Sequence, residues 1–261
     1  MVKMIIMDLD GTLLTNDKNV SEYTLSILRK CKSIDIKIVI ATARSENSGK
    51  RIINLIEPDI MILNGGALVK NNNGKIIYKR LLSKIASDEI ISECVKNKHI
   101  GDITVETEKD YYVSYKEPAY HPDYIHGKYH NFLVPLSQET YKITVEVFSE
   151  GTGEEIENKF KECKYIKFTG EHWGRFAHKE AEKMAAIRAI LEEEEITIKE
   201  TMAFGDDYND IEMIKECGIG VAMGNGIEEI KEAAKYICGN NNEDGLGKWI
   251  EENILKSNAL A

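Results

Sequence analysis

The sequence predicts an α/β protein with a Rossmann-like parallel sheet core and an inserted, smaller α+β domain. Two segments point to the core. The first third and the last third of the chain each alternate short apolar runs with helical segments, a pattern typical of βαβ units. The middle of the chain points to the insert, because it holds alternating β-type runs that suit an antiparallel sheet. We therefore expect residues 1–82 and 181–261 to form the core, and 83–180 the insert. A chain of 261 residues is long enough for both.

The first core segment predicts three strands joined by two helices, which supply the crossovers that parallel neighbours need. Met4–Met7 is a short apolar run that stops at carboxylates, as a buried parallel strand does when it ends at a site. Ser21 can cap the first helix, and Pro58 ends the second. The other two strands are expected at 36–41 and 59–63, and a hairpin-like segment at 67–82 turns at Asn71–Gly74.

The rest of the chain predicts the following elements. In the insert, helices are expected at 84–96 and 154–162, and strands at 103–107, 111–115, 141–148, 165–169 and 173–178. Residues 117–135 hold three of the four prolines and are expected to form a long loop. The last third predicts helices at 180–195, 210–217, 227–234 and 248–255, with strands at 202–204, 219–222 and 236–238.

Charge and cysteine usage limit the classes of partner. With 34 Lys and Arg against 44 Asp and Glu, the formal net charge is −10, which argues against a nucleic-acid partner. Five widely spaced cysteines without a C-x-x-C pair indicate reduced thiols, not a disulfide framework or a zinc site. No apolar run approaches the ~18 residues that span a bilayer, and carboxylates appear too early for a signal peptide. We expect a cytoplasmic protein, a monomer or small homo-oligomer, that binds no nucleic acid and no membrane.

Two carboxylates follow the first strand, where an open α/β sheet binds its ligands. Asp8 and Asp10 lie two residues apart and point the same way if the strand continues. Because adjacent carboxylates repel, they favour a hard cation, and Mg²⁺ fits best. Gly11 allows a sharp exit and lets the backbone approach a phosphate. The alternative is a solvated Asp-Gly turn.

A second acidic cluster, Gly205–Asp210, follows another buried run, so it is expected at the same sheet edge. Its carboxylates would complete an oxygen cage for Mg²⁺. Read alone, the cluster can also be a helix cap whose acids complement the helix dipole.

Three further positions are candidates for binding phosphate. The hydroxyl of Thr42, after the second strand, could donate to a phosphate oxygen, or it could cap the next helix. Lys183, near the start of the helix after the insert, could neutralise a nucleophilic carboxylate and a phosphate together, although most helix lysines are solvated. Gly65, in Asn64–Gly66 at the third strand's end, could turn a backbone amide towards the substrate.

Four stretches of the chain, in order, resemble the four motifs of the haloacid dehalogenase (HAD) superfamily. They are Asp8–Leu14, Thr42, Lys183 and Gly205–Asp210. An aspartate two residues after the first one indicates the phosphatase branch, and the chain most resembles Cof-type hydrolases with a type-two cap between the second and third motifs. Supporting marks are Asn64–Gly66, Gly220–Asn225 and Asn242–Gly245.

The chain departs from that pattern in places. Gly226 and Gly247 stand where alanine is expected, and they indicate changes in packing. Lys179 lies four residues before Lys183, on the same expected helix face, and is the alternative phosphate lysine.

The resemblance implies an HAD-like fold and a phosphatase with an aspartyl-phosphate intermediate. In that mechanism Asp8 is the nucleophile and Asp10 the general acid and base. Thr42 and Lys183 hold phosphoryl oxygens. The remaining implied roles are as follows: Mg²⁺ is held by Asp8, the Asp10 carbonyl and Asp206; Asn209 reaches the phosphoryl group; and Asp207 and Asp210 support the site, Asp210 by orienting Lys183 or a metal-bound water.

The substrate and two competing functions stay open at this stage. Hydroxyl, amide and aromatic side chains of the insert suit a small sugar phosphate: Tyr111, Tyr112, Tyr115, Asn131, His172, Trp173 and Arg175. A sugar phosphomutase of the same branch would share every motif. A phosphate-binding non-enzyme with the same fold would have no need of Asp10. A dinucleotide-dependent oxidoreductase is excluded because no Gly-x-Gly-x-x-Gly follows the first strand.

Overall fold

The computed structural model describes residues 1–115 and 127–256, and the chain divides into two compact units. Unit 1 comprises Met1–Tyr78 and the chain from Lys183 onward, and unit 2 comprises Lys79–Glu182. The crossings expected at residues 82 and 180 therefore fall at 78 and 182. Leu82 explains the first difference: it is fully buried in the insert's core, and its backbone N–H donates to the Thr140 carbonyl at 2.9 Å.

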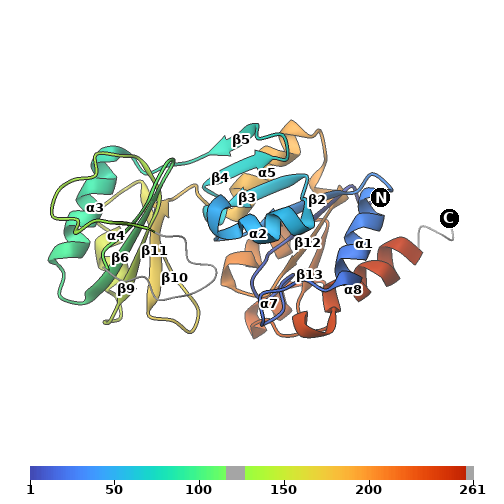
Figure 1. Cartoon of the computed structure of the whole chain (residues 1–261). Helices are drawn as coiled ribbons and strands as arrows, with labels where there is room; N and C mark the ends of the chain where they lie inside the picture. Colours follow the sequence, from blue (N-terminus) through green and yellow to red (C-terminus); the bar gives the residue numbers. More distant parts are fainter. Residues whose placement is uncertain (116–126, 257–261) are drawn as a thin grey trace. The chain divides into compact units, whose positions relative to one another are not determined.

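A single sheet forms the centre of unit 1 (Figure 1). Within the described residues it has eight strands in the order β14-β13-β12-β1-β2-β3-β4-β5. Strands β14 to β3 are parallel, and β4 runs antiparallel to β3. The strands are β1 Met4–Met7, β2 Lys37–Ala41, β3 Ile60–Leu63, β4 Leu68–Asn71, β5 Ile76–Lys79, β12 Thr201–Gly205, β13 Ile219–Ala222 and β14 Tyr236–Ile237. The predicted α/β class with a parallel core sheet is confirmed.

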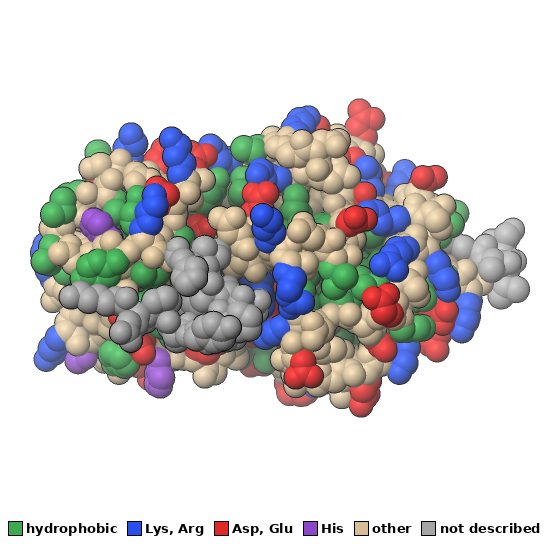
Figure 2. Space-filling model, viewed as in Figure 1, with side chains coloured by type: hydrophobic (Ala, Val, Ile, Leu, Met, Phe, Trp, Pro, Cys, Tyr) green, Lys and Arg blue, Asp and Glu red, His purple; other side chains and the backbone are tan. Residues whose placement is uncertain are grey.

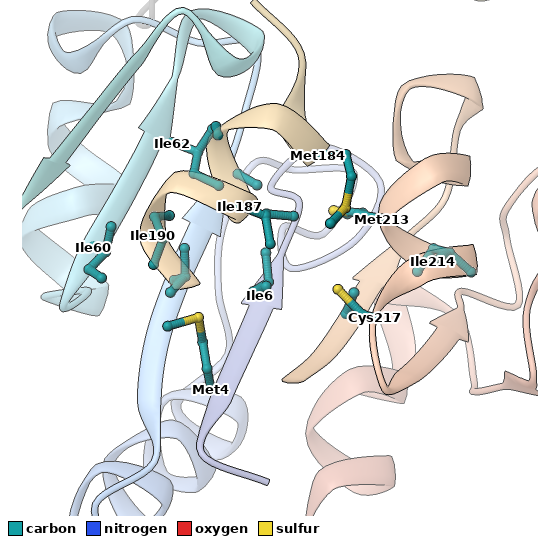
Figure 3. Close-up of a cluster of buried hydrophobic side chains, with 14 of the residues drawn as sticks. Met4, Ile6, Ile60, Ile62, Met184, Ile187, Ile190, Met213, Ile214 and Cys217 are labelled. Atoms are coloured by element: carbon teal, nitrogen blue, oxygen red, sulfur yellow. The ribbon is translucent and has the colours of Figure 1, made fainter. Parts of the chain in front are cut away.

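Both faces of this sheet are covered, which is why its central strands read as continuous apolar runs. On one face, Met4 and Ile6 of β1 pack against Ile187 and Ile190 of α5 (Figure 3). On the other face, Phe204 of β12 meets the ring of Trp249 in α8 edge to face, with centroids 5.8 Å apart. The helices are α1 Glu22–Lys32, α2 Glu46–Ile56, α5 Lys183–Glu193, α6 Ile211–Glu216, α7 Glu228–Ala233 and α8 Gly245–Ile250, followed by a π-helical turn at Glu251–Leu255.

Local sequence signals explain several helix ends. The Ser21 side chain accepts a hydrogen bond from the Thr24 N–H and caps α1, as predicted. Helix α2 ends at Ile56, and its C-cap, Glu57, adopts a left-handed conformation just before Pro58. Helix α5 begins at Lys183, not at residue 180, so Lys179 does not share a helix face with Lys183.

The two unexpected glycines both lie where the chain packs closely. A Cβ at Gly247 would lie 2.7 Å from the Thr24 Oγ1, because α8 packs on α1 there. A Cβ at Gly226 would lie 3.0 Å from the carbonyl oxygen of Asp206. The expected changes in packing are therefore consistent with the observed contacts.

Unit 2 is an α+β domain built on its own sheet. Within the described residues this sheet has six strands in the order β10-β11-β9-β6-β7-β8. Helix α3 packs on β6 and β9, and α3 contacts α4, so the two helices share a core that includes Ile90, Ile143 and Phe176. The elements are α3 Lys84–Lys96, β6 Ile100–Thr107, β7 Tyr111–Val113, β8 Lys128–Tyr129, β9 Thr140–Val147, α4 Thr152–Glu157, β10 Cys163–Lys167 and β11 Trp173–His178.

Two expectations for the insert need correction. The helix expected at 154–162 ends at Glu157, because the chain turns there before entering β10. The loop expected over 117–135 contains β8, which pairs with β7, whereas residues 116–126 lie outside the described part of the chain.

Surface charge is mixed on the face shown in Figure 2, where basic and acidic side chains of the described residues are interspersed. In residues 1–115 and 127–256, no helix has both the length and the apolar character to cross a membrane.

Candidate active site

The predicted site residues follow the carboxyl ends of four strands that are neighbours in the sheet. Asp8 follows β1, Thr42 follows β2, Asn64–Gly66 follows β3, and Asp206 follows β12. The sheet order β12-β1-β2-β3 brings these four strand ends to one edge. This is the edge at which open α/β sheets bind their ligands.

Three carboxylates gather at this edge. Asp8, Asp206 and Asp210 each offer an oxygen, and these oxygens lie within 4.8 Å of one another. Burial raises the pKa of Asp8; Lys183 opposes this rise, and the neighbouring Asp210 and Asp206 add to it. Burial likewise raises the pKa of Asp206 to about 6. A set of closely spaced carboxylate oxygens is the donor set that Mg²⁺ prefers, so the residues present fit this ion.

Lys183 lies between two of these carboxylates. It is the first residue of α5, it is 7% exposed, and its Nζ donates to Oδ1 of Asp8 and to Oδ1 of Asp210, each at 2.6 Å. Burial lowers the pKa of Lys183, but the two carboxylates outweigh burial and raise it. Lys179, the alternative lysine, is exposed in unit 2.

Gly11 and Thr12 bring the first acidic segment against Asp206. The Thr12 hydroxyl donates to Asp206 Oδ1 at 2.6 Å. Gly11 has a φ of +82°, and a Cβ at this position would lie 2.2 Å from Asp206 Oδ2. The missing side chain of Gly11 therefore makes room for Asp206, which is a tighter requirement than the backbone turn that the sequence indicates. Thr12 was not singled out by sequence reasoning.

The Asp10 carboxylate lies between two cations. It accepts hydrogen bonds from Arg44 Nε and Nη2, both at 2.8 Å, and from Lys18 Nζ at 2.7 Å. Burial raises the pKa of Asp10, but the hydrogen bonds and charges of Arg44 and Lys18 outweigh burial and lower it to about 2. Sequence reasoning missed both cations. Arg44 could have been found from its position two residues after Thr42, whereas nothing in the sequence marks Lys18.

Thr42 is fixed from two sides. It is 1% exposed, its Oγ1 accepts a hydrogen bond from the Arg44 N–H at 3.1 Å, and its carbonyl accepts from the Gly65 N–H at 2.8 Å. The alternative in which Thr42 caps the next helix is wrong, because Ser45 caps α2. The expectation that the Gly65 amide faces the substrate also needs correction, since this amide supports Thr42 instead.

The second acidic cluster combines the two interpretations that the sequence left open. The Asp207 carboxylate accepts a hydrogen bond from the Tyr208 N–H at 2.8 Å. Asp210 Oδ2 accepts from the N–H groups of Asp206 and Asp207, at 3.1 and 3.4 Å. These bonds together cap a short helical turn at Tyr208–Asp210. The other oxygen of Asp210 accepts from Lys183. Capping thus fixes Asp210 in the site, while Asn209 lies exposed on the same turn.

Comparison with protein families agrees with this fold. The family of haloacid dehalogenase-like hydrolases matches residues 5–250, and the chain belongs to it. The solved structure of a haloacid dehalogenase-like hydrolase from Bacteroides thetaiotaomicron has a TM-score of 0.84 at 24% identity and covers 97% of this chain and 99% of that one.

Two relatives define the branch. A HAD subclass IIB sugar phosphatase of known structure is 25% identical, with a TM-score of 0.81 and coverage of 96% of this chain and 98% of that chain. The 5-amino-6-(5-phospho-D-ribitylamino)uracil phosphatase YcsE of Bacillus subtilis is 26% identical over 97% of this chain and 96% of its own length. The chain is a Cof-type HAD phosphatase, a phosphoric monoester hydrolase.

Proposed function

We propose that this phosphatase is Mg²⁺-dependent and hydrolyses small phosphorylated metabolites, with sugar phosphates as the preferred class, through an aspartyl-phosphate intermediate. The observation that carries the proposal is the position of Asp8. It is buried in a cluster of three carboxylates at the ligand-binding edge of the sheet, with Lys183 2.6 Å from its Oδ1. A nucleophilic carboxylate requires a cationic partner such as Lys183, because it must approach an anionic phosphoryl group.

The steps assign a task to each residue. The Asp8 carboxylate attacks phosphorus as the bond to the leaving oxygen breaks, and Asp10 protonates that oxygen. Asp10 then takes a proton from water, the water oxygen attacks phosphorus, and the bond to Asp8 breaks. In the free enzyme the cations around Asp10 keep it anionic, so the proton that it gives to the leaving oxygen is taken up from the monoanionic phosphate ester as the substrate binds. The proton that Asp10 takes from water in the second step then passes to solvent, which restores the anionic form.

Other residues hold the phosphoryl group and the metal. Thr42 and Lys183 bind the phosphoryl oxygens, with Asn209 nearby on its turn. Asp8, Asp206 and the backbone carbonyl of Asp10 would hold Mg²⁺. When bound, the ion offsets the repulsion between carboxylates and phosphate.

The proposed substrate class rests on the relatives and on the insert. One relative is a sugar phosphatase, and another acts on a phosphorylated ribityl compound, so both names describe phosphate on a polyhydroxylated carbon chain. We propose that residues 83–180 act as a cap that selects the leaving group, as the exposed or half-buried positions of Tyr111, Trp173 and His172 allow. Free, buried cysteines suit the reducing cytoplasm, where such metabolites are found.

The test is phosphate release by the purified full chain from a panel of sugar phosphates, nucleotides and phosphopeptides, with and without Mg²⁺. Asp8→Asn should abolish turnover without unfolding the protein, since the two side chains are nearly isosteric. Asp35→Asn is the matched control, because Asp35 precedes β2 at the opposite edge of the sheet. Full activity of Asp8→Asn would overturn the mechanism, fastest turnover on a phosphopeptide would overturn the substrate class, and intramolecular phosphate transfer without release would indicate a mutase.

A further inference from the structure

Three asparagines in the last third of the chain, Asn225, Asn241 and Asn242, contact the loop that carries the first acidic segment. Asn225 lies in the turn between β13 and α7, and its Nδ2 donates to the carbonyl oxygen of Gly11 at 2.7 Å. The Oδ1 of the same amide accepts a hydrogen bond from the Asn241 N–H at 2.9 Å. The Asn225 amide therefore joins two segments that are more than two hundred residues apart in the sequence.

Asn241 extends this connection further along the same loop. Its side chain is 7% exposed, and its Nδ2 donates to the Leu14 carbonyl at 2.8 Å and to Asn16 Oδ1 at 3.2 Å. Asn242 adds one more bond, because its Oδ1 accepts from the Asn16 N–H at 2.9 Å. The side chain of Asn225 thus holds the loop Gly11–Asn16 at its first residue, and those of Asn241 and Asn242 hold it near its end.

The turn that carries Asn225 is itself fixed to the second acidic cluster. The Ile227 N–H donates to the Asp206 carbonyl at 3.0 Å, and the Met223 N–H donates to the Gly205 carbonyl at 3.0 Å. The backbone of this turn is therefore hydrogen-bonded to the backbone of Asp206, and the Asn225 side chain is hydrogen-bonded to the backbone of Gly11. The amide therefore links the loop that follows Asp8 and Asp10 to the strand end that presents Asp206.

We propose that Asn225 is a positioning residue for phosphoryl transfer, and that Asn241 holds the Asn225 amide in place. The proposal rests on the proposed function, in which Asp8 and Asp10 carry out the chemistry. A misplacement of about 1 Å in a reacting group can lower a rate about a hundredfold. Because the Asn225 side chain is exposed, water can replace its hydrogen bonds when it is removed, so the fold is retained while the loop is no longer held in register.

Two variants separate positioning from a purely structural role. Asn225→Ala removes both hydrogen bonds. Asn225→Asp keeps the size and the acceptor for Asn241 but loses the donor to the Gly11 carbonyl. Asn253→Ala is the control, because the Asn253 amide makes a similar bond, to the Trp249 carbonyl at 2.9 Å, on the C-terminal helical segment. For each full-length protein, kcat and KM for p-nitrophenyl phosphate are measured at saturating Mg²⁺, together with hydrogen exchange of the peptide that covers residues 9–16 and the unfolding temperature.

The expected result is a fall in kcat of at least about tenfold for both Asn225 variants, with KM changed less than threefold. Exchange in residues 9–16 should be faster in both, and the control should match the wild type. The proposal is overturned if either variant keeps more than half of the wild-type kcat. If Asn225→Ala fails to fold, Asn225→Asp alone decides. A wild-type protein that hydrolyses no phosphate ester would refute the proposed function instead, so the two failures are distinguishable.

Discussion

Lys183 provides the sharpest test of the site's electrostatics, because it is a buried cation whose two partners are also buried. Lys183→Met keeps most of the aliphatic side chain but removes the ammonium. Asp8 and Asp210 are 8% and 1% exposed, so both would lose a charge partner that water cannot readily replace. The substitution should destabilise the metal-free protein strongly.

The magnitude follows from the two hydrogen bonds. Each joins charged groups at 2.6 Å, and such bonds contribute about 1.5–3 kcal/mol apiece. Removing one partner of a buried ion pair costs about 3–5 kcal/mol, in agreement with that sum. For a chain of this size, the unfolding temperature should fall by about 6–20 °C. The carboxylates raise the pKa of Lys183, so the stabilisation is complete below its ordinary value and is lost only above it. An assay at pH 7 therefore measures the full effect.

Urea unfolding followed by circular dichroism, in the presence of a chelator, measures this loss. Arg188→Met is the matched control, because Arg188 lies on the same helix and pairs with Glu216 at the surface, where such a pair contributes at most about 1 kcal/mol. Adding Asp210→Asn to Lys183→Met should recover part of the stability, since one buried charge is then removed. A loss below about 1 kcal/mol for Lys183→Met would show that the ammonium does not hold these carboxylates.

Three further predictions concern the metal, Asp10 and Gly11. Because burial raises the pKa of Asp206 to about 6, this carboxyl stabilises the metal-free fold below its ordinary pKa of 3.8 and loses that contribution as the pH rises through 6. The rise in unfolding temperature on adding Mg²⁺ should accordingly be small at pH 4.5 and complete by pH 7, and a pH-independent rise would contradict this. Arg44→Met should raise the pKa of Asp10 from about 2, so the pH range over which kcat/KM falls as Asp10 loses its proton should move to higher pH; an unmoved range would remove Arg44 from this role. Gly11→Ala should lower kcat about a hundredfold, because its Cβ would meet Asp206, whereas Gly74→Ala, with a φ of +81° and nothing within 4 Å, should cost only about 1 kcal/mol of stability and leave kcat unchanged.

The sequence predicted the parts of the site that depend on strand ends. Asp8, Thr42 and Asp206 each come directly after an apolar run, and neighbouring parallel strands end at the same edge whatever the loops do. The fold class was predictable for the same reason, since alternation of apolar runs and helices is visible in the chain itself. The family comparison then confirmed the phosphatase class.

The contacts that depend on loop conformation could not be predicted. Lys18 reaches Asp10 only because the chain bends back after Gly11, and Asn225 reaches the Gly11 carbonyl across 214 positions of sequence. The start of α5 was also misplaced, because Glu180, Ala181 and Glu182 are good helix formers that nevertheless precede the helix. Lys183 therefore stands at the first turn of the helix, where its side chain reaches two carboxylates.

The charges of the site divide into two groups, and their balance bears on the proposed dependence on a divalent ion. Three carboxylates and the Lys183 ammonium sum to −2 when all are ionised, whereas Asp10 with Arg44 and Lys18 sums to +1. A phosphate dianion brought against a group of −2 is repelled, and the raised pKa values of Asp8 and Asp206 show that this group already resists full ionisation. Protonating Asp8 would relieve the repulsion but would also remove the nucleophile. A divalent cation would relieve the repulsion while leaving Asp8 anionic, so this charge balance supports the proposed magnesium dependence.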